Sequence, residues 1–263
     1  MTLRNIIFAA GVFCSVILSA QSSNAQTTPA QPAQPAPSSI LPPAGDPVGN
    51  VATLTGSATI ARFGNATTLK VNDDIYMGDT LQTSADSALG ITFNDETTFN
   101  LSANARIVVN NYVYEEGGRK NSALFNVARG TVAFVASAVA KTGDMKIATP
   151  TATLGIRGTT GVIAVPDDAS TTSGNNVAIK LYPDQDGKVG RIEVNGRDGA
   201  RLGLLSQASS GFAIRSSGTG RFAAAPLQIS PQQAARDQGF VRQVHAAQNI
   251  GRQIVTQQRA LRQ

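Results

Sequence analysis

Few residues in this 263-residue chain could carry catalytic or metal chemistry. It contains one histidine, His245, one cysteine, Cys14, and no tryptophan. A single histidine and a single cysteine cannot build a zinc site or a disulfide framework. His245 lies in the C-terminal tail, so serine and cysteine hydrolases would lack their usual general base. We therefore expect a protein that is not an enzyme and that holds no cofactor and no metal.

Paired carboxylates are the remaining groups that could perform acid–base chemistry. They fall where turns are expected, at Asp73-Asp74, Asp95-Glu96, Glu115-Glu116, Asp167-Asp168 and Asp184 with Asp186. Aspartate is common in turns because its carboxylate accepts hydrogen bonds from nearby backbone N–H groups. A glycosidase is the enzymatic alternative, but such enzymes generally surround the sugar with aromatic rings, and the chain has only four tyrosines.

The stretch from Asp184 to Gly187 is similar to the start of a calcium-binding loop. An EF-hand requires glycine at its sixth position and a bidentate glutamate at its twelfth, and this sequence has neither. We expect a hairpin turn here, with a weak calcium site as the alternative.

The first 25 residues are typical of a cleaved signal peptide. Arg4 precedes the apolar run from Ile6 to Ala20, and Ser23-Asn24-Ala25 supplies small residues for the peptidase. The run is shorter than the roughly 20 residues of a membrane span, so an uncleaved anchor is the weaker alternative. Cleavage after Ala25 predicts a cysteine-free protein that is periplasmic, secreted or at the cell surface and is not an integral membrane protein. It would be held by its core rather than by disulfides.

Residues 26–47 predict a disordered linker. Seven of the twelve prolines fall there, together with Ala, Gln, Ser and Thr. Such a segment has little to bury and favours extended polyproline geometry, so it serves as a semi-rigid spacer. A ligand for a proline-binding module is the alternative.

Residues 48–225 predict an all-β fold. Short runs of Val, Ile, Leu, Phe and Thr are punctuated by Gly, Asn and Asp. We expect an elongated β-roll or sandwich of about a dozen short strands, with no helix before residue 226. Three hairpins are predicted, 89–93 with 97–101 (one face buried), 107–114 with 123–127, and 177–181 with 189–194. A turn at 195–199 leads into a strand with Leu202, and Phe212 and Ile214 mark a further strand.

The tail, residues 226–263, predicts a basic helix. Ser230, Pro231 and Gln233 form a helix start with a capping box, and a weak apolar stripe follows at Phe240, Val244, Ala247, Gly251, Ile254, Gln258 and Leu261. The excess positive charge of the exported chain lies here, in Arg236, Arg242, Arg252, Arg259 and Arg262 against Asp237. Such a helix could bind anionic lipid, an acidic polymer or another helix, or it could dock on its own domain. We expect no nucleic-acid binding, because the tail lacks lysine and has one aromatic residue.

Four segments carry a resemblance to a known family. They are Gly78-Asp79-Thr80-Leu81-Gln82-Thr83, then 88–93 with its turn, then Ala128-Arg129-Gly130-Thr131-Val132, and finally 147–152 running into Gly155-Ile156-Arg157-Gly158-Thr159. In this order and spacing they resemble the FecR domain family over residues 51–165. The chain is therefore divided into a FecR-like β domain at 48–165, a β extension at 166–225 and the basic helix.

The resemblance implies an exported, largely β, non-enzymatic domain. In iron-uptake regulators, similar domains face the periplasm and contact the signalling domain of an outer-membrane TonB-dependent receptor, while a cytoplasmic part controls a sigma factor. This chain has a signal peptide and a spacer where the regulators have their cytoplasmic and membrane segments. This departure puts sigma-factor control in doubt, and a stand-alone exported FecR-like protein is the better description.

Two functions from different classes follow from this description. The first is a binding or signalling-interaction module whose partner is an envelope protein, such as a TonB-dependent receptor. The second is a structural envelope component that its basic tail anchors to lipid, peptidoglycan or polysaccharide.

The motif residues are expected to be structural. They are Gly78, Asp79, Arg129, Gly130, Arg157, Gly158 and Thr159. Gly78 and Gly158 would supply turn conformations, Asp79 would accept backbone N–H bonds in its own turn, and Arg157 would satisfy carbonyls or pair with a carboxylate, for which Asp79 is the candidate. The alternative is contact with a partner, for which the candidates are Arg157, Tyr112, Tyr114, Arg242, Arg252 and Arg259.

Overall fold

The computed structural model describes residues 45–169, 176–216 and 220–262. The predicted signal peptide and the predicted spacer up to residue 44 lie outside the described residues. Seventeen strands and two helices occur in the described ranges. The prediction of an all-β fold that ends in a helix is confirmed, with more strands than the expected dozen.

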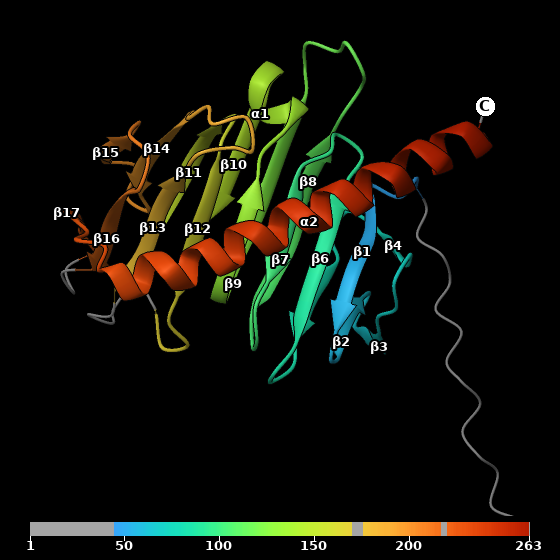
Figure 1. Ribbon diagram of the computed structural model, residues 1–263, viewed down its shortest axis with the longest axis horizontal. Coiled ribbons are helices and arrows are strands. Elements are labelled where there is room, and N and C mark those ends of the chain that lie inside the picture. The colour runs from blue at the N-terminus through green and yellow to red at the C-terminus, as the bar shows by residue number, and fades with distance from the viewer. Residues whose placement is uncertain (1–44, 170–175, 217–219, 263) are drawn as a thin grey trace, which may run out of the picture. The chain divides into compact units, whose positions relative to one another are not determined.

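The strands form two layers, which we call sheet A and sheet B (Figure 1). Sheet A is antiparallel and contains, in spatial order, β4 (Asp74–Ile75), β1 (Gly49–Thr55), β6 (Ala88–Phe93), β7 (Thr98–Leu101), the second half of β9 (Ser122–Val135), β12 (Thr160–Val165), β13 (Val177–Tyr182), β16 (Ser210–Ser216) and β17 (Phe222–Pro226). Sheet B contains, in spatial order, β3 (Asn65–Thr68), β2 (Ala58–Arg62), β5 (Thr80–Thr83), β8 (Arg106–Val113), the first half of β9, β10 (Asp144–Ala148), β11 (Ala152–Arg157), β14 (Arg191–Gly196) and β15 (Arg201–Leu205). The β9–β10 pair is parallel and the other pairs of sheet B are antiparallel.

Strand β9 belongs to both sheets because it bends at Gly130. Its residues up to Arg129 pair with β8 in sheet B, and those from Gly130 onward pair with β12 in sheet A. Gly130 has φ +83°, a conformation that costs an L-residue roughly 1–2 kcal/mol. A Cβ at Gly130 would also collide with the backbone of Ala105. Glycine is therefore the residue that lets one strand cross between the two layers.

The core lies between the two sheets and is rich in phenylalanine. Phe93 and Phe99 of sheet A both pack on Phe125 of sheet B, with ring centroids 4.8 and 4.6 Å apart. All three side chains are fully buried. Burial of one such side chain contributes roughly 1.5–3 kcal/mol, so this contact does much to hold the sheets together.

Helix α2 (Pro231–Arg262) lies across the outer face of sheet A, over β1, β6, β7, β9 and β12 (Figure 1). Its start is the predicted capping box: the Gln233 backbone N–H donates to the Ser230 hydroxyl, and the Ser230 N–H donates to the Gln233 side chain. Val244, Ala247 and Gly251 of the predicted stripe are buried against the sheet. The predicted hairpin 89–101 is formed by β6 and β7, but both of its faces are buried, because the helix covers the second one.

Two predictions about connections are wrong. Strands β13 and β14 do not pair, because the turn at Asp184–Gly187 carries the chain from sheet A to sheet B rather than closing a hairpin. A five-residue helix, α1 (Ala138–Thr142), precedes residue 226 and carries the chain between β9 and β10. Its Val139 and Ala140 are buried in the core, so it is part of the sandwich.

Candidate functional site

Asp79 of the first motif is the centre of a buried ion pair. Its carboxylate is fully buried and accepts hydrogen bonds from Arg62 Nε (2.7 Å to Oδ1) and Nη2 (2.7 Å to Oδ2), and from the Tyr76 backbone N–H at 2.7 Å. The hydrogen bond to Asp79 raises the pKa of the Arg62 guanidinium. Asp79 therefore accepts a backbone N–H of its own turn, as predicted, and Gly78 has the left-handed φ of +90° expected of a turn glycine. The predicted pairing of Asp79 with Arg157 is wrong, since the partner is Arg62.

Arg157 lies at the end of β11, at the edge of the outer face of sheet B. Its Nη1 donates to the Ile156 carbonyl at 3.1 Å, and its Nη2 lies 3.9 Å from Asp144 Oδ1. The side chain is 34% exposed, so part of the guanidinium remains accessible. Gly158 follows with φ +52°, and the buried Thr159 hydroxyl donates to the Tyr182 carbonyl. This motif holds a turn and leaves one cation at the surface.

The two tyrosines proposed as partner contacts have internal roles. Tyr112 is 8% exposed; its hydroxyl donates to Asp95 Oδ1 at 3.1 Å and accepts from the Asp95 N–H at 2.8 Å. Burial is the main cause of the raised pKa of Tyr112. Tyr114 is half-buried and packs against the core. The burial of Tyr112 is contrary to a role in contacting a partner.

A buried charged cluster joins α2 to sheet A. Asp237 accepts hydrogen bonds from Lys180 Nζ and from the Tyr182 hydroxyl, both at 2.6 Å. All three residues are at most 6% exposed. Burial, followed by the hydrogen bond to Asp237, raises the pKa of Tyr182. Asp237 is the one acid of the tail, so this contact removes it from the surface of the helix.

The remaining contacts fix the helix further along. Asn100 donates to the Gln243 side chain at 3.1 Å, and Gln248 donates to the Glu96 carbonyl at 3.1 Å. Arg252 Nε lies 2.9 Å from the Glu96 carboxylate. Of the tail arginines proposed as partner contacts, Arg242 is exposed and Arg252 is paired, while the side chain of Arg259 lies outside the described residues.

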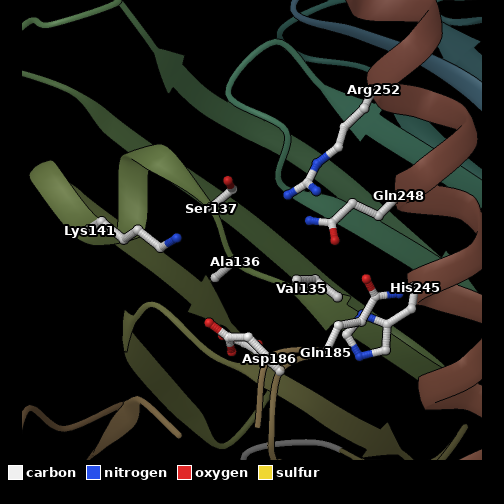
Figure 2. A pocket seen from close by; sticks show the side chains of 10 residues that line it. Val135, Ala136, Ser137, Lys141, Gln185, Asp186, His245, Gln248 and Arg252 are labelled. Atoms are coloured by element: carbon white, nitrogen blue, oxygen red, sulfur yellow. The ribbon is translucent and has the colours of Figure 1, made fainter. Parts of the chain in front are cut away.

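A pocket of about 230 Å³ opens beside the helix (Figure 2). Its walls come from the α1 region, the turn between β13 and β14, and α2, which contribute Lys141, Asp184, Asp186, His245, Gln248 and Arg252 among others. Desolvation lowers the pKa of the His245 imidazole; Asp184 acts in the opposite direction and Arg252 in the same one. From the sequence we expected no catalytic role for His245, because it lies in the C-terminal tail. In the fold, α2 packs on sheet A and places His245 in the wall of the pocket.

The pocket does not assemble a nucleophile and a base. Within the described ranges, no hydrogen bond joins His245 to Ser137, Asp184 or Asp186, and its Nδ1 is buried without a partner. Asp184 accepts from the Thr160 hydroxyl at 2.6 Å, and Asp186 binds Lys188 at 2.7 Å. In the described part of the chain, no group of three or more His, Cys, Asp or Glu side chains is arranged for a metal ion.

The outer face of sheet B is the broad sheet surface that no described helix crosses. Its strands alternate buried and exposed residues, whereas β6, β7 and β12 of sheet A are buried almost throughout. The outward positions carry many basic residues and fewer acidic ones: Arg106, Arg129, Lys146, Arg157, Arg191 and Arg201 against Asp144 and Glu193. We call these eight residues the basic face. Residues 26–225, the predicted spacer and β region together, are neutral in sum, but the fold concentrates positive charge on one side of the β region.

The comparisons with known proteins support the family resemblance. Residues 79–178 match the family model described as FecR protein, which confirms the FecR resemblance over that segment. The matched segment contains Asp79, Arg129, Gly130, Arg157, Gly158 and Thr159. The matched segment starts and ends later in the chain than residues 51–165, the range over which the resemblance was predicted.

Two crystal structures of a protein titled "putative anti-sigma factor" from Parabacteroides distasonis ATCC 8503 are similar to the chain. They share 11% and 10% identity with it, both with a TM-score of 0.40, and the alignments cover 62% of this chain and 73% and 74% of theirs. A search of curated proteins found no match. Neither described helix combines the length and apolar character that a bilayer crossing requires.

Proposed function

We propose that this protein is a non-enzymatic, exported FecR-like interaction module of the bacterial cell envelope, and that its basic face binds an acidic envelope protein in signalling. The observation that carries the proposal is the position of α2. The helix covers the outer face of sheet A, so the exposed sheet surface is the outer face of sheet B, where basic residues outnumber acidic ones by six to two. Such a surface attracts a negatively charged partner and orients it during encounter.

Two sequence features support the envelope location. The first 25 residues are typical of a signal peptide, and the FecR match implies a domain that works outside the cytoplasm. A TonB-dependent receptor remains one candidate partner through the resemblance. The surface of such a receptor that meets this protein would have to present carboxylates to the basic face.

The alternative is a structural envelope component held by its helix. The exposed Arg236 and Arg242 on α2 favour this reading, because they could bind anionic lipid or polymer. The buried stripe opposes insertion into a membrane, since Val244 and Ala247 pack on sheet A and Ile250 is the one exposed large apolar side chain in the described part of the helix. Anchoring would then rest on electrostatic attraction alone.

Charge reversal on the full-length exported protein separates the two. One variant carries Lys146→Glu and Arg191→Glu on the basic face, and the matched control carries Arg236→Glu and Arg242→Glu on the helix, so the net charge changes equally. Both variants and the parent are cross-linked in the native envelope, and captured proteins and glycans are identified. We expect a discrete acidic protein whose capture falls at least about tenfold in the first variant, remains in the second, and weakens with salt. Loss of capture in the helix variant alone, with recovery of only lipid or polymer, would contradict the proposal.

A further inference from the structure

Two arginines lie directly opposite each other on the basic face. Arg106 of β8 and Arg129 of β9 are cross-strand partners in sheet B. Like charges in this position destabilise a sheet, because the side chains of opposed residues are close together. Arg129 also belongs to the motif shared with the FecR domain, and Gly130 after it marks the point where β9 leaves sheet B.

Neither guanidinium has an ion-pair or hydrogen-bond partner within the described residues. Arg129 Nε is buried and unsatisfied. An unpaired buried donor is costly, more so when it is charged, and such groups in folded proteins are nearly always satisfied by protein, water or ligand. By contrast, the second cross-strand pair of arginines on this face, Arg157 and Arg191, has Asp144 and Glu193 within 3.9 Å.

The pairing of the neighbouring strands places two further polar side chains in line with Arg106 and Arg129, across the strands of sheet B. The register between β8 and β9 shifts next to Arg106, a bulge that re-aims side chains at the end of the strand pair. Gln82 of β5 lies opposite Arg106 on its other side, and Thr59 of β2 lies opposite Gln82. An amide and a hydroxyl therefore extend the row beyond the two guanidiniums.

We propose that Arg106 and Arg129 form a binding site for a carboxylate, which is the point where an acidic side chain of the partner docks. Paired guanidiniums suit this ligand because each can donate two parallel N–H groups to its oxygens. The proposal rests on the proposed function only in taking the carboxylate from the partner protein. The site itself belongs to this chain and can be tested without the partner.

The test follows the Arg129 Nε–H signal by ¹H–¹⁵N NMR while the full exported chain is titrated with citrate at constant ionic strength. We expect a saturable shift, and an affinity about 10- to 100-fold weaker in Arg106→Gln, the range expected for losing a charge-assisted hydrogen bond. Arg119→Gln, at an exposed position in the connection between β8 and β9 and outside the basic face, is the matched control and should bind citrate as the parent does. Without citrate, Arg106→Gln should raise Tm by about 1–4 °C, because the like-charge pair is gone.

Three binding outcomes would overturn the site. They are no saturable shift of Arg129 Nε–H, equal affinity in Arg106→Gln, and tighter binding of inorganic phosphate than of citrate. A lower Tm in Arg106→Gln would show that the pair stabilises the sheet and is not held for a ligand. If citrate binds as expected but the variant with Lys146→Glu and Arg191→Glu captures the partner as the parent does, the carboxylate site stands and the proposed function fails. If that variant loses the partner but citrate does not bind, the basic face still binds the partner and the Arg106–Arg129 site fails.

Discussion

Substitution of Asp237 tests how α2 is held on sheet A. Asp237→Ala would leave the Lys180 ammonium and the Tyr182 hydroxyl buried without their shared partner, since both donate to Asp237 at 2.6 Å and are at most 6% exposed. Removing one member of a buried ion pair costs about 3–5 kcal/mol. A domain of this size loses about 2–4 °C of Tm per kcal/mol, so we expect Tm to fall by about 6–20 °C.

The matched variant replaces the whole cluster with apolar side chains: Lys180→Met, Tyr182→Phe and Asp237→Leu. Exchanging a buried ion pair for apolar groups is often neutral or stabilising, so we expect stability close to that of the parent or above it. Urea unfolding is followed by far-UV circular dichroism, because the chain has no tryptophan to report by fluorescence. The reasoning fails if Asp237→Ala lies within about 1 kcal/mol of the parent, or if the triple variant is as unstable as the single one.

Three further predictions concern single residues. Gly130→Ala should cost more than about 2 kcal/mol in urea unfolding, from its positive φ and the collision with Ala105; a smaller cost would contradict the bend assigned to it. Gly251→Val should speed amide exchange in β6, because a side chain there would overlap Thr92; unchanged exchange would show that the helix is not closely packed. The free energy of unfolding should fall as the pH is lowered through 6.5, because the pKa of His245 is lower in the fold than in the unfolded chain, so unfolding takes up a proton. His245→Gln should flatten this part of the pH profile of stability. An unchanged profile would show that other groups cause it.

Local signals in the sequence predicted local structure well. The start of α2 depends on Ser230 and Gln233, three residues apart, and the structure contains both hydrogen bonds of that capping box. The β6–β7 pair could also be predicted, because a short turn joins two strands that are neighbours both in the sequence and in space. Such features are decided by a few adjacent residues.

Features that depend on which sheet a strand joins could not be predicted. The turn at Asp184–Gly187 has the same residues whether its flanking strands pair or separate, and here they separate. The predicted strand 123–127 continues to Val135 in β9, because Gly130 bends the strand without ending it. The Arg62–Asp79 pair joins residues 17 positions apart through the register of β2 and β5, which the sequence does not show.

The candidate interaction surface was hidden for a related reason. Counting charges by segment gives a neutral sum for residues 26–225, and the basic face appears only when β8, β10, β11 and β14 are placed side by side with their alternation known. His245 was likewise assigned only to the tail, whose docking on the domain the sequence left open. Its position in a pocket wall depends on close packing of the helix, in which Ala247 meets Gly90 and Gly251 meets Thr92.

The most direct test of the central claim, that the partner binds the basic face and not the helix, is site-specific photo-cross-linking in the native envelope. A photoreactive residue is placed at Lys146 on sheet B or at Arg242 on α2, both of which are exposed. We predict a discrete cross-link to an acidic protein from position 146, weakened by salt, and none from position 242. A protein cross-linked from position 242 alone, or from neither position, would contradict the account.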